Sequence, residues 1–460
     1  MITSDLWRGK RYAVLGLARS GAATVRALVA SGAGAVAWDS DEAKRNAIIA
    51  PPLQGRGWGG AELDAGLGET SPTSNPSAEG EGLLSLADPE TLDLTGFDAL
   101  VVSPGVPINK HPVAAKAKTA GVPLIGDIEL FAQARAGLPP HKVVGITGTN
   151  GKSTTTALIH HILVTAGVPA RLGGNIGLPI LGEEPLPAGG VYVLELSSYQ
   201  IDLTQSLDCD VAVLLNITPD HLDRYDGFEG YAASKARLFA MQAKDHDAVI
   251  GLGDAASAAI ARSLSAKGEH LHKIAPGVCM DQSRWPSLQG PHNAQNALAA
   301  ITACQALGVA EADIDRGLES FTGLPHRMQR IGSRSGVAYI DDSKATNPES
   351  TAPALAAFDR VHWILGGRSK GDDLDACAPH FGHVARAYTI GEAGPKFAAL
   401  LRPHMAVEES GRLDVAVTSA AAHAQPGETV LLSPACASFD QFRDYEDRGD
   451  QFRAAVEALA

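Results

Sequence analysis

A glycine-rich stretch followed by lysine and serine, Gly-Thr-Asn-Gly-Lys-Ser at residues 148–153, is the strongest chemical signal in the sequence. Such a turn presents backbone N–H groups to an anion, the following helix adds positive potential, and the lysine reaches the terminal phosphates. The strict P-loop spacing would place glycine at position 146, where this chain has Ile146. Because the turn separates a strand pattern from an apolar helical pattern, we predict binding of ATP or GTP, with Lys152 on the β- and γ-phosphates and Ser153 on Mg²⁺. A purely structural glycine turn is the alternative.

Polar residues follow the next two predicted strands. Glu195 ends one apolar strand pattern, and His221 follows the next one, between Asp220 and Asp223. The carboxyl ends of parallel strands line the ligand crevice of an open sheet, so these side chains are candidates for holding a metal ion or a substrate. The alternative for Glu195 is a solvated carboxylate at a strand end.

Three further polar residues lie on predicted helices. From helical spacing alone, Lys235 in Tyr-Ala-Ala-Ser-Lys-Ala-Arg is expected to be a solvated surface residue. Asn293 and Asn296 are three residues apart and share one helix face, where amides suit a nucleotide base or a phosphate. Helix capping is an equal alternative for the two asparagines.

The last third of the chain collects cations and hydroxyls near predicted strand ends. These residues are His326, Arg327, Asp342, Lys344, Thr346, Asn347, Arg368, Lys370 and Ser438. Arginine supplies a two-pronged donor for phosphate that lysine cannot supply. We expect Ser438 at a helix N-terminus, and together the residues predict a pocket for small acidic substrates.

The bulk properties exclude several classes of function. A net charge of −14 and a pI near 5.5 make nucleic acid and anionic membrane surfaces unsuitable partners. Five cysteines without a Cys-x-x-Cys pair argue against a disulfide framework and a zinc knuckle, and we expect buried, reduced thiols. No apolar run reaches the ~18 residues of a membrane helix, so we expect a soluble cytoplasmic protein.

The elements that position these residues alternate between strand and helix patterns. Residues 11–41 read as strand, glycine turn, helix and strand, the opening of a nucleotide-binding α/β domain. Gly16 and Gly21 fit the dinucleotide fingerprint, whereas Ala18 replaces its middle glycine, so NAD binding is weakly supported and another phosphate ligand, or none, is the alternative. Residues 51–82 contain eight glycines and four prolines, which predicts a flexible surface insertion.

The length of 460 residues suggests three domains. Linker-like segments at 137–140 and near 323–325 divide the chain into residues 1–137, 138–323 and 324–460. We therefore predict an α/β protein with a Rossmann-like first domain, a central P-loop ATPase-like parallel sheet, and a Rossmann-like third domain with a parallel sheet.

Nine motifs in fixed order resemble the Mur ligases of peptidoglycan synthesis, over all of the chain except residues 51–82. The motifs are GTNGKSTT, GGNIG, ELSSYQ, NITPDHLDRY, SKARLF, HNAQNALAA, LPHRMQ, DDSKATNP and LLSPACASFDQF. The last two look most like the member that adds D-glutamate. The resemblance implies that ATP phosphorylates the carboxylate of UDP-N-acetylmuramoyl-L-alanine and that the amine of D-glutamate attacks the acyl phosphate. A sibling ligase, a folylpolyglutamate synthase-like ligase and a non-catalytic nucleotide-binding regulator are the alternatives.

The resemblance also implies roles for individual residues. The implied ATP contacts are Gly148, Thr149, Asn150, Gly151, Lys152, Ser153, Thr154, Asn293, Asn296, Arg327 and Asp342. Two Mg²⁺ ions are implied, with Ser153 and Glu195 on the first, His221 on the second, and Lys235 as a carbamylated, anionic ligand. The implied catalytic set is Lys152, Glu195, His221, Lys235 and Lys344.

The implied substrate contacts form three groups. The residues implied to contact the UDP group are Arg19, Ser20, Asp39, Ser40 and Ser103. The muramoyl-alanyl part falls to Asn175, Ser197 and His221. D-glutamate and the acyl phosphate fall to Lys344, Thr346, Lys370, Ser438 and Tyr445. We expect a monomer whose outer domains close on the central one about the linkers near 137 and 323.

Two residues depart from the pattern of the family. Tyr445 stands where a phenylalanine is usual, so its hydroxyl needs a partner. Asp341 replaces a common asparagine before Asp342, which adds negative charge near an acidic substrate.

Overall fold

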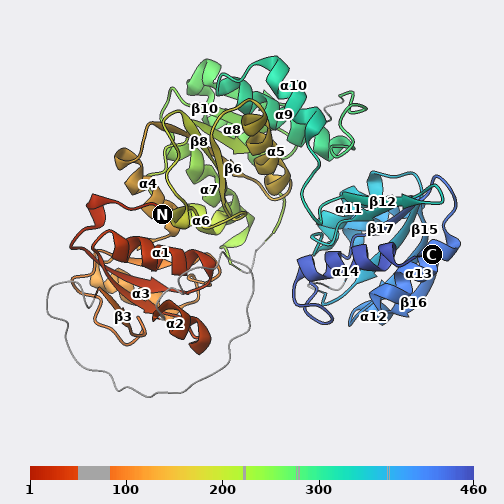
Figure 1. Ribbon diagram of the computed structural model, residues 1–460, viewed down its shortest axis with the longest axis horizontal. Helices are drawn as coiled ribbons and strands as arrows, with labels where there is room; N and C mark the ends of the chain where they lie inside the picture. The colour runs from red at the N-terminus through yellow and green to blue at the C-terminus, as the bar shows by residue number, and fades with distance from the viewer. Residues whose placement is uncertain are drawn as a thin grey trace. The chain divides into compact units, whose positions relative to one another are not determined.

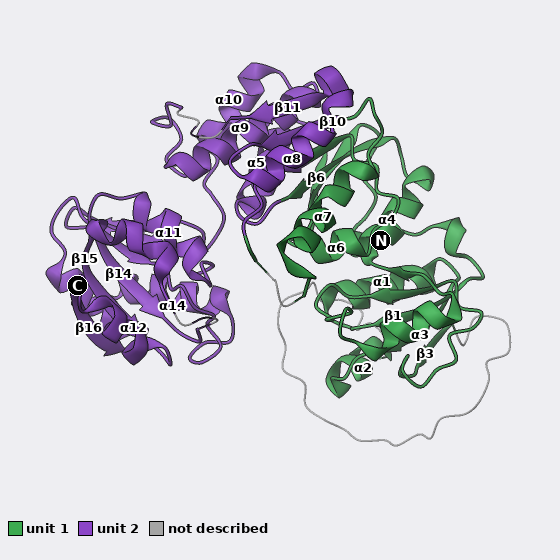
Figure 2. Cartoon of the chain, turned by 180° about the vertical axis from the view of Figure 1, so that it is seen from behind, with its two compact units in different colours: residues 1–147, 169–212, 219–246 green, residues 148–168, 213–218, 247–460 purple. Residues whose placement is uncertain are grey.

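The computed structural model describes residues 1–49, 83–220, 224–275, 277, 280–369, 371 and 373–459. The predicted insertion at 51–82, His221 and Lys370 lie outside the described residues. In the described part, the strands form three β-sheets of five, six and six strands, with helices alongside them (Figure 1). The chain divides into two compact units, shown in Figure 2. Unit 1 comprises residues 1–147, 169–212 and 219–246, and unit 2 comprises residues 148–168, 213–218 and 247–460.

The first sheet lies in unit 1 and has the order β3-β2-β1-β4-β5, with parallel pairing throughout. Its strands are β1 (Arg11–Leu15), β2 (Gly34–Trp38), β3 (Leu84–Leu86), β4 (Ala99–Val102) and β5 (Leu124–Ile125). The accompanying helices are α1 (Arg19–Ala30), α2 (Glu42–Ile49), α3 (Pro112–Ala120) and α4 (Asp127–Ala134). The chain runs outward from β1 to β3 and then returns to β4 on the other side of β1. Such a switch point opens a crevice at the carboxyl ends of β1 and β4, and ligands bind there in sheets of this kind.

Unit 1 also holds three parallel strands of the second sheet, in the order β6-β8-β7. These are β6 (His141–Thr147), β8 (Gly190–Glu195) and β7 (Ala170–Gly174), and β9 (Val211–Leu214) belongs to the same sheet. Every residue of β8 is buried, as the continuous apolar run predicts for a strand covered on both faces. Helices α6 (Ser198–Asp202) and α7 (Gly227–Ala240) follow in this unit.

Unit 2 contributes the parallel pair β10 (Asp247–Gly251) and β11 (Leu271–Ile274) to the second sheet. Its helices before the C-terminal sheet are α5 (Lys152–Thr165), α8 (Ala255–Ser263), α9 (Pro291–Ala306) and α10 (Glu311–Ser320). Helix α5 ends two residues before Gly167. The 3-10 helices of the described chain are η1 (Asp5–Trp7), η2 (Arg135–Gly137), η3 (Ile180–Gly182), η4 (Ser265–His270) and η5 (Asp375–His383).

The third sheet has the order β12-β13-β17-β14-β15-β16. Its strands are β12 (Gln329–Arg334), β13 (Val337–Asp341), β14 (Val361–Gly366), β15 (Val384–Ile390), β16 (Ala406–Gly411) and β17 (Thr429–Leu432). The expectation of a purely parallel sheet is wrong at one edge, because β12 pairs antiparallel with β13. Ser335 and Gly336 both have positive φ, 50° and 78°, and a two-residue turn of that kind joins antiparallel strands.

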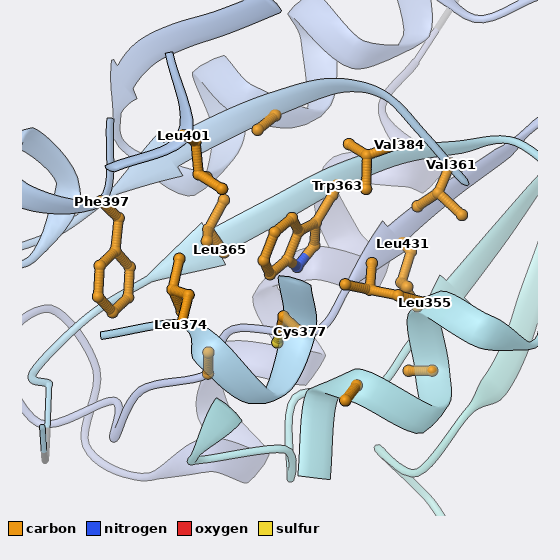
Figure 3. Close-up of a cluster of buried hydrophobic side chains, with 14 of the residues drawn as sticks. Leu355, Val361, Trp363, Leu365, Leu374, Cys377, Val384, Phe397, Leu401 and Leu431 are labelled. Atoms are coloured by element: carbon orange, nitrogen blue, oxygen red, sulfur yellow. The ribbon is translucent and has the colours of Figure 1, made fainter. Parts of the chain in front are cut away.

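Helices cover both faces of the third sheet and bury two hydrophobic clusters. The helices are α11 (Pro348–Ala356), α12 (Gly394–Leu401), α13 (Leu413–His423) and α14 (Tyr445–Glu457). Consecutive residues of β14 alternate between the clusters, with Trp363 and Leu365 in one and Ile364 in the other. Figure 3 shows the indole of Trp363 at the centre of its cluster, with Leu365 on one side and Leu431 on the other.

Four of the five cysteines are described, and these four are buried thiols that form no disulfide. Burial raises the pKa of the Cys304 thiol to about 12, which keeps it protonated. Among the described helices, none has the length and apolar character needed to cross a lipid bilayer.

Candidate functional site

The glycine-rich loop of unit 2 lies directly before α5, in a conformation that glycine makes accessible. Gly148 and Gly151 have φ values of 151° and 86°. A Cβ on Gly151 would lie 2.3 Å from Oδ1 of Asn296, so α9 packs against the backbone of the loop. The Lys152 ammonium donates to the carbonyl oxygens of Gly148 and Thr149, at 2.9 and 2.7 Å. The loop is therefore built as the sequence predicted, with its lysine folded over it.

Asn216 fixes the outer part of this loop. Its side-chain Oδ1 accepts from the N–H of Asn150 at 2.9 Å, and its Nδ2 donates to the Asn150 carbonyl at 3.1 Å. The N–H of Thr149 donates to the Asn216 carbonyl at 2.9 Å. Asn216 was not predicted as a site residue, although an asparagine two residues after a buried strand is a signal for such a role.

The two asparagines of α9 do not cap the helix, so the capping alternative is wrong. The N-cap is Gly290, and Asn293 Nδ2 donates to the Gln289 carbonyl at 3.1 Å. Asn296 Nδ2 donates to Oδ1 of Asn293 at 3.1 Å. Both side chains are buried, 5 % exposed, on the face of α9 that borders the loop.

A pocket of about 140 Å³ in unit 2 brings many of the predicted residues together. The predicted residues that line it are Asn150, Gly151, Thr154, Asn293, Asn296, Arg327, Asp342 and Lys344. Arg327 donates from Nη2 to the Ser153 hydroxyl at 2.8 Å. A guanidinium therefore lies next to the first turn of α5, where a terminal phosphate would gain two favourable charges.

Asp342 is the acidic member of this pocket. It accepts from the Ser433 hydroxyl at 2.7 Å and from the Met328 N–H at 3.2 Å. Burial raises the pKa of Asp342 to about 7, against the smaller lowering effect of the hydrogen bonds. The carboxyl group thus changes charge within the physiological range.

The substituted aromatic residue, Tyr445, keeps a partner for its hydroxyl. The hydroxyl donates to Glu446 at 2.9 Å, and the Lys344 ammonium lies 3.7 Å from the ring centroid. A cation over an aromatic face is favourable, and either Phe or Tyr supplies that face. Burial, followed by the effect of Glu446, raises the pKa of Tyr445 to about 12.

The remaining candidates of the third sheet lie in loops. Thr346 is half-buried in the loop between β13 and α11, which begins after the N-cap Asn347. Ser438 is 2 % exposed, but it does not begin a helix as expected. Helix α14 begins at Tyr445, after the N-cap Asp444, because the aspartate side chain accepts from the Asp447 N–H.

Unit 1 has its own pocket, of about 450 Å³, at the switch point of the first sheet. The predicted residues that line it are Arg19, Ser20, Asp39, Ser103 and Asn175. Ser103 donates to the Gly16 carbonyl at 2.7 Å, and a Cβ on Gly21 would lie 1.8 Å from the same oxygen. Both glycines are therefore needed for the turn and for the close packing of α1.

The charge of Asp39 in this pocket is held by specific contacts. Burial alone would raise the pKa of Asp39, but N–H donors from Leu17 and Asp41 and the ammonium of Lys44 lower it. Lys44 lines the pocket and was not selected from the sequence, although a lysine just after the Asp39 strand end is a signal for it. Ser40 is exposed and is not among the lining residues.

Ser197 is the N-cap of α6 rather than a lining residue of the unit 1 pocket. Its hydroxyl accepts from the Gln200 N–H at 3.3 Å, and Gln200 Oε1 accepts from the Ser197 N–H at 3.1 Å. This reciprocal arrangement is a capping box. Gln200, which follows Ser197 after β8, lines the pocket instead.

Glu195 and Lys235 of unit 1 are both buried, at 2 % and 1 % exposure. The expectation from spacing that Lys235 is solvated is wrong, because this face of α7 is covered. The Lys235 ammonium lies 4.6 Å from the Tyr231 ring and 3.5 Å from the Thr147 hydroxyl. Glu195 is not a solvated strand-end carboxylate either, so that alternative is wrong.

The donor set of unit 1 suits a hard cation. Glu195 Oε1 accepts from Asn175 Nδ2 at 2.9 Å, whereas Oε2 is buried and has no hydrogen-bond partner among the described residues. A buried carboxylate oxygen of this kind is a fitting ligand for Mg²⁺. Within the described ranges, no three His, Cys, Asp or Glu side chains form a metal cluster by themselves, and His221 lies outside those ranges.

Comparisons with known proteins agree with this layout. The Mur ligase middle domain matches residues 146–283, and the Mur ligase glutamate ligase domain matches residues 326–436. The UDP-N-acetylmuramoylalanine–D-glutamate ligase of Novosphingobium aromaticivorans is 60 % identical over 461 residues, covering 100 % of this chain and 97 % of that protein. The protein of the same name from Sphingopyxis alaskensis is 59 % identical and covers 100 % of both chains.

Solved structures support the fold. The UDP-N-acetylmuramate-alanine ligase MurC of Thermotoga maritima superposes with a TM-score of 0.56 at 15 % identity, covering 98 % of this chain and 99 % of the other. MurF ligase of the same organism, in complex with ADP, gives a TM-score of 0.56 at 16 % identity, with coverages of 79 % and 90 %. At such identities the likeness concerns the α/β fold alone.

Proposed function

The chain belongs to the Mur ligase family, and on that premise we propose that it is an ATP-dependent ligase that joins D-glutamate to UDP-N-acetylmuramoyl-L-alanine. The observation that carries this function is the identity of 55 to 60 % with ligases named for this reaction, each aligned over the whole of this chain. The reaction belongs to the synthesis of peptidoglycan precursors.

The proposed chemistry begins with a carboxylate, which is a poor electrophile. Its oxygen attacks the γ-phosphorus of ATP, the bond to the bridging oxygen breaks, and ADP leaves. The amine of D-glutamate then attacks the acyl carbon of the acyl phosphate and loses a proton, and the tetrahedral intermediate expels inorganic phosphate to leave an amide. Such transfers depend on positioning and on neutralising phosphate charge.

Unit 2 supplies the proposed nucleotide site. The phosphates are assigned to the loop of residues 148–154 and to the uncapped N–H groups at the start of α5, with Lys152 and Arg327 as cations. Within that loop the N–H groups of Thr149 and Asn150 donate to Asn216. Asn293, Asn296 and Asp342 border the same pocket, and we assign them to the rest of the nucleotide. The complex of the related MurF ligase with ADP supports a nucleotide in this fold.

Magnesium is the cofactor that the oxygen-rich side chains fit. We assign the Ser153 hydroxyl and the Glu195 carboxylate to one ion, and His221 to a second. Bound Mg²⁺ supplies charge neutralisation for the phosphoryl group. We also propose that Lys235 is carbamylated, because a buried lysine that gains CO₂ becomes an anionic oxygen ligand, and its burial at 1 % exposure supports this role.

The pocket of unit 1 is proposed for the UDP-sugar. Its volume of about 450 Å³ is in the range of ligand sites, and α1 begins there with no side-chain cap, so its N–H groups face an anion. We assign Arg19, Ser20, Asp39, Ser40 and Ser103 to the UDP group. Asn175 and Ser197 are assigned to the muramoyl-alanyl part, together with His221.

The cations and hydroxyls of unit 2 are proposed for D-glutamate and the acyl phosphate. These residues are Lys344, Thr346, Lys370, Ser438 and Tyr445. The Lys344 ammonium is held over the Tyr445 ring, which supports a fixed positive charge for an acidic substrate. We further propose a cytoplasmic monomer of three domains, with Rossmann-like outer domains and a P-loop ATPase-like centre, that closes on its ligands about the segments near 137 and 323.

A substrate screen tests the proposed function. Phosphate release is measured with ATP, Mg²⁺ and UDP-N-acetylmuramoyl-L-alanine, and the amino acid is varied. We expect D-glutamate to support release and L-lysine and diaminopimelate to support little. A folate offered in place of the UDP-sugar should also support little. If activity were greatest with one of the other substrates, the chain would instead be a sibling Mur ligase or a folylpolyglutamate synthase-like ligase. Scattering curves that do not change when nucleotide and UDP-sugar are added would contradict the proposed closure.

A further inference from the structure

A buried histidine–aspartate pair supports the loop that carries Arg327. His326 Nδ1 lies 2.8 Å from Asp341 Oδ2, and the two residues are 6 % and 0 % exposed. The other oxygen of Asp341 accepts from the Ser343 N–H at 2.9 Å. Gly449 of α14 leaves room for the pair, since a Cβ there would lie 2.0 Å from His326 Nδ1 and 2.7 Å from Asp341 Oδ2.

The loop held by this pair is strained on both sides of Arg327. His326 and Met328 have φ values of 59° and 48°, in the left-handed region that non-glycine residues avoid. Such conformations persist only where the surroundings fix them, and they concentrate at functional sites. Three hydrogen bonds join the pair in fixing the loop.

Two hydrogen bonds tie the strained loop to the residues that follow β13, and a third ties it to the start of β12. The Lys344 N–H donates to the His326 carbonyl at 3.0 Å, and the Met328 N–H donates to Asp342 Oδ1 at 3.2 Å. The His326 N–H donates to Gln329 Oε1 at 3.1 Å. The same hydrogen bonds therefore position the backbone around Arg327 and the backbone at Lys344, two residues that line the pocket.

We propose that Asp341 is a positioning residue that acts through His326, and that the pair fixes the strained loop so that Arg327 reaches the Ser153 hydroxyl and the phosphate-binding loop. The inference deepens the proposed function and rests on it. Asp341 itself is buried beneath the pocket and does not line it, so its effect on the nucleotide is indirect.

The charges that face His326 come from three elements. Asp341 on β13 is its hydrogen-bond partner, and Asp450 and Glu446 on α14 are the other acidic neighbours, with Asp450 3.8 Å from Nε2. Tyr445 of α14 meets the imidazole edge to face, and Arg327 and Lys344 are the neighbouring cations of the loop and the strand end. Arg448 of α14 is buried and donates to the Ser343 hydroxyl at 2.9 Å and to its carbonyl at 2.7 Å.

The balance of these charges favours the imidazolium form. The hydrogen bond to Asp341 raises the pKa of His326, and burial opposes it with a smaller effect. The positioning effect is then present below the raised pKa and is lost as the pH rises through it. Without the negative charge of Asp341, we expect a lower pKa for His326, so that the positioning effect is lost at a lower pH.

The test compares Asp341→Asn with a matched control, Glu428→Gln. Glu428, which is partly buried, is hydrogen-bonded to the buried His362 at 2.9 Å in another His–carboxylate pair, at the opposite end of the same sheet. We expect Asp341→Asn to raise the KM for ATP about tenfold with a smaller change in kcat, the size expected for a charged hydrogen bond. The alkaline limb of kcat/KM for ATP should move to lower pH. Glu428→Gln should leave the KM and the limb unchanged.

A second variant and two further measurements keep the inference testable if Asp341→Asn folds poorly. His326→Gln should raise the KM for ATP and remove the alkaline limb, and the His326 imidazole of the wild-type protein should titrate above ~6.5 by NMR. ADP affinity by calorimetry needs no turnover, so it separates this inference from the identity of the amino-acid substrate. Unchanged ADP affinity in both variants, or equal effects in Glu428→Gln, would overturn the inference.

Discussion

Asn175 holds Glu195 by two hydrogen bonds, one from its side chain and one from its backbone. Its Nδ2 donates to Oε1 of Glu195 at 2.9 Å, and its N–H donates to the Glu195 carbonyl at 2.8 Å. The preceding residue, Gly174, permits this approach, since a Cβ there would lie 2.1 Å from the same carbonyl oxygen. Asn175 also lines the unit 1 pocket, so one amide links the proposed UDP-sugar site to a proposed metal ligand.

Asn175→Ala should therefore weaken metal binding as well as substrate binding. Groups that orient metal ligands typically contribute 10- to 100-fold in metal affinity. We expect the Mg²⁺ concentration for half-maximal activity to rise roughly tenfold and the KM for the UDP-sugar to rise with it. Asn46→Ala, at an exposed position of α2, is the control and should change neither value. A normal Mg²⁺ requirement in Asn175→Ala would refute the link.

Lys152→Ala tests whether the chain is a catalyst or a nucleotide-binding regulator. Loss of a cation from the transferring phosphoryl group should lower the rate of phosphate release by at least ~100-fold. Lys142→Ala, an exposed lysine of β6, should retain the wild-type rate. If a folded Lys152→Ala protein kept part of its cellular role although phosphate release was lost, the regulator alternative would be favoured.

Lys235→Ala should be partly rescued by short carboxylic acids. The deleted side chain leaves space in a buried site, and formate or acetate could supply the anionic oxygen that a carbamate supplies in the wild-type protein. Activity is followed while the acid concentration is raised. Lys152→Ala should gain nothing from the same acids, because it lacks a cation rather than an anion. Failure of rescue at every concentration would count against carbamylation.

Asp342 should make the stability of the protein depend on pH. Burial raises its pKa to about 7 from an ordinary 3.8, so the folded state binds this proton more tightly than the unfolded state does. The stabilising contribution is full below about pH 4 and is lost as the pH rises through about 7, with a size on the order of a few kcal/mol. Asp342→Asn should flatten this part of the curve of Tm against pH.

The control for this prediction is Asp245→Asn, at an exposed position. It should reproduce the wild-type dependence of Tm on pH, since a solvated carboxylate interacts similarly with its surroundings in both states. An equal slope in the wild-type protein and Asp342→Asn between pH 5 and 8 would contradict the buried titration.

The pattern of apolar and polar residues in the sequence was sufficient to predict most of the strands and helices near the site. The alternation of apolar strands with helices gave β1, β6, β8, β14 and α5 close to their observed bounds, because each strand is covered on both faces. The glycine turn at 148–153 was predictable because its residues restrict the backbone locally. The antiparallel β12 was missed, since its pairing depends on a two-residue turn rather than on strand hydrophobicity.

The positions of single side chains were harder to predict. Lys235 was predicted to be a surface residue because helical spacing does not show which neighbouring elements cover a helix face. Ser438 was predicted to begin a helix, but the N-cap of the following helix is Asp444. Asn216 was missed because its role depends on a loop that is distant in the sequence. Helical spacing alone predicted a solvated Lys235, whereas the family resemblance implied a role for this lysine in the site.

Trp363 connects the hydrophobic interior of the third sheet to the pocket of unit 2. Its indole N–H donates to the Ser433 carbonyl at 2.8 Å, and the Ser433 hydroxyl donates to Asp342 at 2.7 Å. Ser433 thus links Asp342 to Trp363, a natural fluorophore packed in a hydrophobic cluster. We expect a change in the charge of Asp342 to alter the fluorescence of this indole. If the other tryptophans were replaced, the emission of this one indole would turn proton uptake or nucleotide arrival into an optical signal, with no label attached.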